Sequence, residues 1–234
     1  MSKSKTLLQP EFPLTAFQFM RLLKKNNNRE WFNGRKKEYL LEKAGVEVFA
    51  DALITELNKH DVIETLSGKQ CLHWIYRDVR FSKDKSPYRP EWSGSFKRAT
   101  KYRRGGYYFH IEEGNTFVGG GFRAPNAPDL KLIRDDIAFD DAPLRKILKS
   151  KSFIKNFGTL QGEQLKTTPK GYEAASPGID LLRYKQFLLI RKFSGKEVSD
   201  KDFFLQVSHT FRAMRPFFDY MSEVLAADAN GAMA

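Results

Sequence analysis

The densest positive charge of this chain lies in one short stretch that could hold an anion. Between residues 77 and 104 there are ten basic residues against three acidic ones, a local net charge of +7 out of +12 for the whole chain. Arginine binds phosphate and carboxylate groups well because its planar guanidinium offers paired donors. We therefore predict an anion site whose candidate residues are Arg77, Arg80, Lys83, Lys85, Tyr88, Arg89 and His110.

A structural interpretation of the same charges stays open beside the functional one. Asp78 lies two residues before Arg80 and could pair with it, and Asp84 with Lys85 could hold a turn. If 72–81 is one strand, Arg77 shares a face with apolar neighbours, so it should pair with a carboxylate or meet a ligand.

His110 is the best candidate for moving a proton. Alternation along a strand gives it one face with Tyr108 and Glu112, and a histidine titrates near neutral pH. A cross-strand structural role is the alternative. The four histidines of the chain are scattered, without the spacing of metal ligands, so we predict no metal and no cofactor.

Two further residue types have structural explanations. The run at 119–121 (Gly-Gly-Gly) has the glycine content of a phosphate loop but lacks the Gly-Lys-Ser/Thr that follows in one, so close backbone packing explains it better. Cys71, the only cysteine, lies beside Leu72 in an apolar stretch. We expect it to be a small buried residue with no catalytic role.

The elements that would position these residues fall into three groups. Helical spacing of apolar residues predicts helices before residue 60, the second of them capped by Asn27 with Glu30. Strands are predicted at 72–81 and, with a turn at Glu113-Gly114-Asn115, as a hairpin over 106–121. Shorter helices follow, and strands are predicted again at 164–168 and 184–193.

The order of these elements defines a fold class. Helices lie at both ends, strands lie in the middle, and regular β-α-β alternation is absent. We predict an α+β fold with an antiparallel or mixed central sheet flanked by N-terminal and C-terminal helices. The predicted organisation is a single α+β domain over 13–226, with a flexible arm at 1–12 and a flexible tail at 227–234.

Composition sets broad limits on location and partners. The sequence has 234 residues, one cysteine and no apolar run long enough for a signal peptide or a membrane span, so we expect a cytoplasmic protein with no membrane partner. Its pI near 9.6 favours anionic partners. The basic stretch with its interleaved aromatic residues fits nucleic acid. An enzyme acting on a small phosphorylated or carboxylated metabolite is the alternative, and the oligomeric state stays undefined.

Several motifs resemble one family of proteins. They are NNREWFNGRKKEY at 27–39, RDVRFSKDKSPY at 77–88, YYFHI at 107–111, FVGGGF at 117–122 and PKGY at 169–172. Together they are similar to the conserved hypothetical proteins catalogued as domain-of-unknown-function family 2461, from about residue 17 to about residue 218. The resemblance implies one intact α+β domain and no particular activity, substrate or catalytic residue.

Overall fold

A computed structural model describes residues 10–99 and 103–226. The helices before the sheet are α1 (Leu14–Lys25), α2 (Arg29–Gly34), α3 (Lys36–Leu57) and α4 (Gly68–Cys71). The strands are β1 (Trp92–Lys97), β2 (Gly106–Ile111), β3 (Thr116–Phe122) and β4 (Phe187–Phe193). Between β3 and β4 lie α5 (Ala127–Phe139), α6 (Ala142–Leu148), α7 (Lys151–Phe157) and α8 (Ile179–Leu182). After β4 come α9 (Gly195–Val198), α10 (Phe203–Ala213) and α11 (Arg215–Ala226).

The four strands form one antiparallel sheet in chain order, β1-β2-β3-β4, which confirms the predicted α+β class. The predicted hairpin is also confirmed: β2 and β3 pair with Tyr107 opposite Gly120 and His110 opposite Phe117. Gly114 turns this hairpin with a φ of 77°, a conformation that glycine adopts without steric cost.

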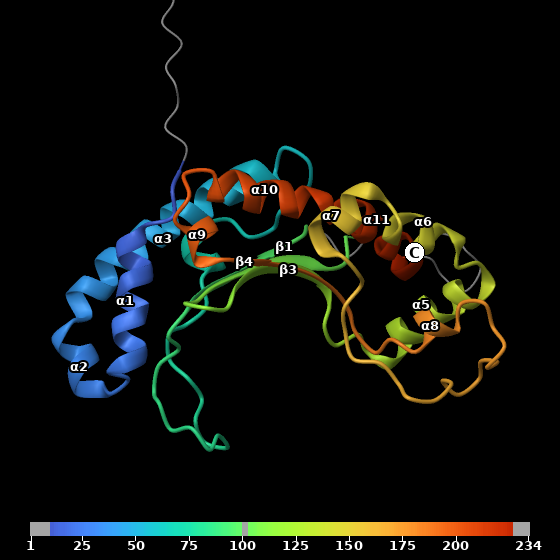
Figure 1. The fold of residues 1–234 in the computed structure, drawn as a ribbon, viewed down its shortest axis with the longest axis horizontal. Coiled ribbons are helices and arrows are strands. Elements are labelled where there is room, and N and C mark those ends of the chain that lie inside the picture. The colour runs from blue at the N-terminus through green and yellow to red at the C-terminus, as the bar shows by residue number, and fades with distance from the viewer. Residues whose placement is uncertain (1–9, 100–102, 227–234) are drawn as a thin grey trace, which may run out of the picture.

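The two faces of the sheet have different surroundings. On one face the buried side chains of Phe96 and Phe109 pack against α10 and α3, where they meet Phe211 and Phe49 at ring-centroid distances of 5.8 and 6.3 Å. Figure 1 shows α3 and α10 on this side. Beyond the other face, α1 and α2 extend at one end and α5 and α8 at the other, so the molecule forms an arch over an open sheet surface (Figure 1).

The second helix begins one residue later than the predicted cap. Asn28 accepts a hydrogen bond from the backbone N–H of Trp31 at 2.9 Å and is the N-cap of α2. Asn27 instead binds both backbone groups of Tyr88, donating to its carbonyl at 2.9 Å and accepting from its N–H at 3.1 Å. A contact across 61 residues of sequence thus takes the side chain that local spacing assigned to the helix.

The strand predicted at 72–81 is wrong. Only isolated bridges join this segment to its surroundings, Leu72 to Gly94 and Tyr76 to Tyr88, so residues 77–81 are not part of the sheet. The chain leaves the sheet edge and returns near residue 90 as a projecting loop (Figure 1). Aromatic residues are common in strands, but no sheet covers those of this loop. Trp74 is 80% and Phe81 96% exposed. The strand predicted at 164–168 is also wrong, since the only bridge within it, among the described residues, joins Gln164 to Tyr184.

Arg98 is buried, contrary to the exposed position that the basic stretch suggests. Its side chain donates to Asp61 at 2.6 Å and to Asp219 at 3.0 Å, and only 2% of the residue is exposed. Asp61 also accepts from the hydroxyl of Tyr107 at 2.8 Å. A buried charge needs a partner for each of its polar atoms. These partners come from several elements, so the ion cluster connects the end of α3 to the sheet and to α11.

Other predictions concern the ends of the chain and the absence of membrane or metal contacts. Most of the predicted arm at 1–12 and all of the predicted tail at 227–234 lie outside the described residues. Within 10–99 and 103–226, no helix is both long and apolar enough to cross a membrane, and no three potential metal ligands gather at one point. Cys71 is buried as expected, and burial raises the pKa of its thiol.

Candidate functional site

The projecting loop neutralises much of its own charge. Arg80 donates to Asp78 through Nε at 2.9 Å, and Arg77 pairs with Asp84. The ammonium of Lys85 donates to a backbone carbonyl of the same loop at 3.0 Å. These contacts match the structural interpretation of the loop. Exposed ion pairs of this kind are weak, so the loop arginines remain able to exchange partners.

Two further residues of the predicted anion site do not gather with its other members. Tyr88 is only 3% exposed and stacks on Phe32 with ring centroids 4.2 Å apart, so it belongs to the core. Lys83 is exposed in the projecting loop. The charges of the remaining candidates, Arg77, Arg89 and His110, each lower the pKa of Glu91, at the base of the loop.

A groove of about 630 Å³ lies on the open face of the sheet. Its lining includes His73, Ser95, Tyr108, Phe117, Gly119, Arg123 and Ile190. Gly119 keeps the floor of the groove low, since a Cβ there would lie 3.0 Å from the carbonyl oxygen of Leu189. The next glycine, Gly120, faces the core, where a Cβ would approach Phe218 to 2.7 Å. Close packing therefore explains the glycine run, as predicted.

A chain of hydrogen bonds runs beside this groove. Lys24 donates to Glu112 at 2.9 Å, the other carboxylate oxygen of Glu112 lies 3.1 Å from Nε2 of His110, and Nδ1 of His110 lies 3.2 Å from the hydroxyl of Tyr108. The tautomer with its proton on Nε2 satisfies both contacts of the imidazole. The shared face of His110, Tyr108 and Glu112 is thus confirmed, with a connection to α1 that the strand pattern could not predict.

Two carboxyl groups near His110 are shifted in opposite directions. Burial raises the pKa of Glu91 above its ordinary value, and the negative charge of Glu112 adds to this, while His110, Arg89 and Arg77 oppose it. For Glu112, burial also acts upward, but hydrogen bonds with Lys24, His110 and Asn115 bring its pKa below the ordinary value. One carboxyl therefore holds its proton more readily and the other stays ionised, the pattern of an acid–base site.

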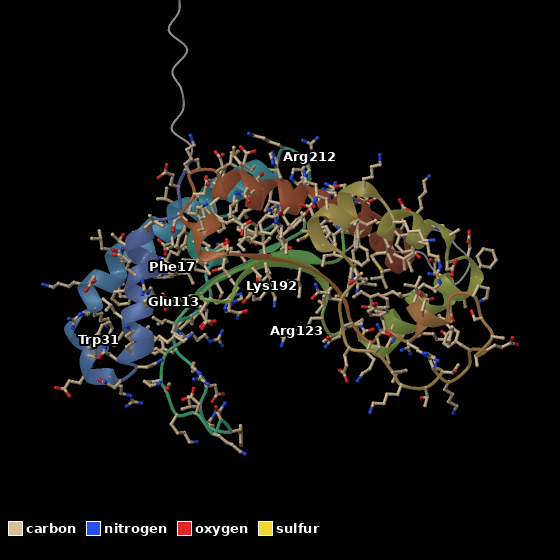
Figure 2. All side chains as sticks on the ribbon, in the orientation of Figure 1. Phe17, Trp31, Glu113, Arg123, Lys192 and Arg212 are labelled. Carbon is tan, nitrogen blue, oxygen red and sulfur yellow. The ribbon has the colours of Figure 1, made fainter. Side chains whose placement is uncertain are left out.

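Two cations act on the same site. Burial raises the pKa of Tyr108, whereas a hydrogen bond with Ser93 and the positive charges of Arg89 and Arg123 lower it. Figure 2 shows Arg123 and Lys192 beneath the sheet, on its open side. Arg123, which follows β3, lines the groove, and Arg89, at the base of the projecting loop, acts on Tyr108 and His73 in its lining, so both charges would attract an anion in the groove.

His73 closes the site at the β1 edge. Its two ring nitrogens lie 3.3 Å from the hydroxyl oxygen of Ser93 and 2.9 Å from that of Ser95. Desolvation lowers the pKa of His73, and the charge of Arg89 lowers it further, so this imidazole is neutral at pH 7. A neutral imidazole between two hydroxyl groups can donate or accept a proton beside the groove.

Sequence reasoning missed Glu91, His73 and Arg123 as members of this site. Glu91 counted only as an opposing charge in the basic stretch, and His73 only as a histidine without metal-ligand spacing. The signal that could have found them is register, because pairing β1 with β2 places Ser93 opposite His110 and Ser95 opposite Tyr108. Arg123 gave no local signal beyond its place after the hairpin.

The fold and the site together describe an α+β protein with an acid–base cluster on an open sheet face. The chain matches the family described as conserved hypothetical protein DUF2461 over residues 15–220, and it belongs to that family. No curated protein and no solved structure matches the chain.

Proposed function

We propose that this protein is an enzyme that binds a small carboxylated or phosphorylated molecule in the groove and transfers a proton to or from it. The observation that carries the proposal is the hydrogen-bond chain from Lys24 through Glu112 and His110 to Tyr108, which lines the groove, together with the opposite pKa shifts of Glu91 and Glu112 beside it. Perturbed carboxyl groups in a cleft are typical of functional sites. The small-molecule alternative thus gains support over a role for the loop alone.

Each residue of the cluster has a chemical role in this proposal. Glu91, whose raised pKa makes it hold its proton more readily than an ordinary glutamate does, is the general acid. Tyr108 accepts a proton from the substrate at its hydroxyl oxygen, while its own proton passes to Nδ1 of His110, 3.2 Å away. His110 accepts the proton of Tyr108, and Glu112 stabilises the imidazolium that results. Arg89 and Arg123 hold the anionic group of the substrate.

The test is a comparison of matched variants against a library of carboxylated and phosphorylated metabolites. The full-length protein is incubated with the library, and consumption is followed by mass spectrometry. Glu91→Gln and Tyr108→Phe should each slow any reaction found by about 10²–10⁴-fold, because general acid–base groups contribute that much. Arg80→Ala, in the projecting loop, is the control and should leave the rate unchanged. A reaction that survives both groove substitutions would contradict the proposal.

Nucleic-acid binding by the projecting loop is a second candidate, favoured by its exposed aromatic residues. Trp74, Tyr76 and Phe81 are 80%, 51% and 96% exposed, and the guanidinium of Arg80 lies 5.9 Å from the ring centre of Phe81. Such rings stack on single-stranded bases. Phe81→Ala should weaken binding of a single-stranded oligonucleotide by about 5- to 100-fold, whereas Glu91→Gln should not. Equal affinity of wild type and Phe81→Ala would exclude this candidate.

The expected cellular location belongs with these proposals. We infer a cytoplasmic protein, and the buried thiol of Cys71, which forms no disulfide, supports a reducing compartment.

A further inference from the structure

A second pocket, of about 720 Å³, lies between α7, α10 and β4. Helix α7 contacts both α10 and β4 in this region. Figure 2 shows Arg212 on the outer side of α10, whereas Arg123 and Lys192 lie beneath the sheet. The pocket is therefore separate from the groove of the proposed enzyme site, and β4 lies between the two.

The pocket is lined by positive charge. Its cationic residues are Lys151, Lys155, Arg191 and Arg212, and its other polar residues are Ser150, Ser152, Asn156, Gln206 and His209. None of the described residues that line it is acidic. In the projecting loop, by contrast, Arg77 and Arg80 each have a carboxylate of the same loop beside them.

Arg191 gives this pocket a positioned guanidinium. Its two terminal nitrogens donate to Oγ1 of Thr210 at 2.9 Å and to Oε1 of Gln206 at 3.0 Å, and its side chain is 25% exposed. The nearest carboxylate oxygen, from Glu197, lies 3.9 Å away, beyond hydrogen-bond distance. The hydrogen bonds that hold the guanidinium in place thus come from neutral partners, and its one nearby carboxylate is at ion-pair distance only.

We propose that this pocket binds a small polyanion with two or more phosphate or carboxylate groups. The cations repel one another, and an anion placed among them would remove that repulsion and gain charge-assisted hydrogen bonds. Serine hydroxyls and the Asn156 amide can add neutral hydrogen bonds to the remaining oxygens. The apolar residues Ile147, Phe153 and Pro216 also line the pocket and can cover one side of the ligand.

Calorimetric titration of the full-length protein with pyrophosphate tests the proposal. Arg212→Glu and Lys155→Glu should each weaken binding by at least about 10-fold, because each change removes a charged donor and adds a repulsive charge. Lys146→Glu is the matched control: this exposed lysine on α6 changes the net charge equally but does not line the pocket. Melting temperatures should show that all three variants are folded.

Three results would overturn the proposal. The first is no heat of binding with pyrophosphate, and the second is binding that Arg212→Glu and Lys155→Glu leave unchanged. The third is an equal loss in Lys146→Glu, which would mean that pyrophosphate responds only to net charge. The groove variant Glu91→Gln should bind pyrophosphate here as wild type does, so failure of the enzyme proposal and failure of this one are distinguishable.

Discussion

The projecting loop and the groove both combine arginine with carboxylates, yet they assemble them over different sequence distances. Asp78 meets Arg80 two residues away and Asp84 meets Arg77 seven residues away, so the loop satisfies its charges locally. In the groove, Glu112 meets Lys24 across 88 residues. The difference teaches that a high local charge density in sequence marks residues that can pair with one another within a loop, whereas the cluster beside the groove needs groups that separate elements bring together.

The largest expected effect separates two arginines of the same basic stretch. Arg98→Ala should lower the free energy of unfolding by about 3–5 kcal/mol, because it leaves the buried carboxylate of Asp61 without its main partner. Arg80→Ala should leave the free energy of unfolding close to that of wild type, because its side chain is 77% exposed. Urea unfolding at pH 7 measures both. Similar losses in the two variants would contradict the division into buried and exposed arginines.

A smaller effect, of opposite sign in two variants, should distinguish the carboxyl groups of the groove. The folded-state pKa of Glu112 is lowered, so its ionised form adds stability above its ordinary pKa, and this is lost as pH falls through the folded value. The folded-state pKa of Glu91 is raised, so its ionised form costs stability above that value. At pH 7, Glu112→Gln should destabilise and Glu91→Gln should stabilise the protein, each by about 1 kcal/mol.

Thermal unfolding between pH 3 and 8 measures the stability of Glu91→Gln and Glu112→Gln against that of wild type. The two differences from wild type should shrink toward zero at the acid end, where both carboxyl groups are protonated in the folded and unfolded chains. If Glu91→Gln destabilised the protein at pH 7, its carboxylate would be a structural partner and its assignment as general acid would be wrong.

The smallest expected effect is a change in the titration of one imidazole. Arg89→Ala should raise the pKa of His73, because the charge of Arg89 is one of the two causes that lower it. Arg80→Ala, with its arginine paired in the loop, should leave that pKa unchanged. Histidine ring resonances followed by NMR through a pH titration give both values. If the pKa of His73 did not change in Arg89→Ala, Arg89 would not act on the groove and would belong to the projecting loop alone.

Local patterns predicted the parts of the fold that depend on neighbours in sequence. The hairpin follows from Gly114 between two alternating strands, and the face shared by Tyr108, His110 and Glu112 follows from the two-residue period of β2. The α+β class and the antiparallel sheet follow from the order of such elements. The motifs of the chain also sufficed for the family resemblance, which the match over residues 15–220 confirms.

Long-range contacts decided the parts that sequence reasoning missed. Residues 72–81 have the composition of a strand, but they have no strand beside them and project from the sheet edge. Tyr88 looked available to a ligand and is instead packed on Phe32 and held by Asn27. In each case the free energy of burial or pairing in the tertiary structure outweighs the local conformational preference of the residues.

By itself, the sequence determined the fold class, the hairpin, the excess of positive charge and the family, because these depend on composition, on motifs and on periods of two to four residues. Only the tertiary structure decided which charges are buried, which are paired and which share a groove. Arg98 and Arg80 are the same residue type within one basic stretch, and their exposure differs because one meets Asp61 from α3's end and the other stays in a loop. Electrostatic energy depends on distance and burial, and neither is a property of a residue's position in sequence.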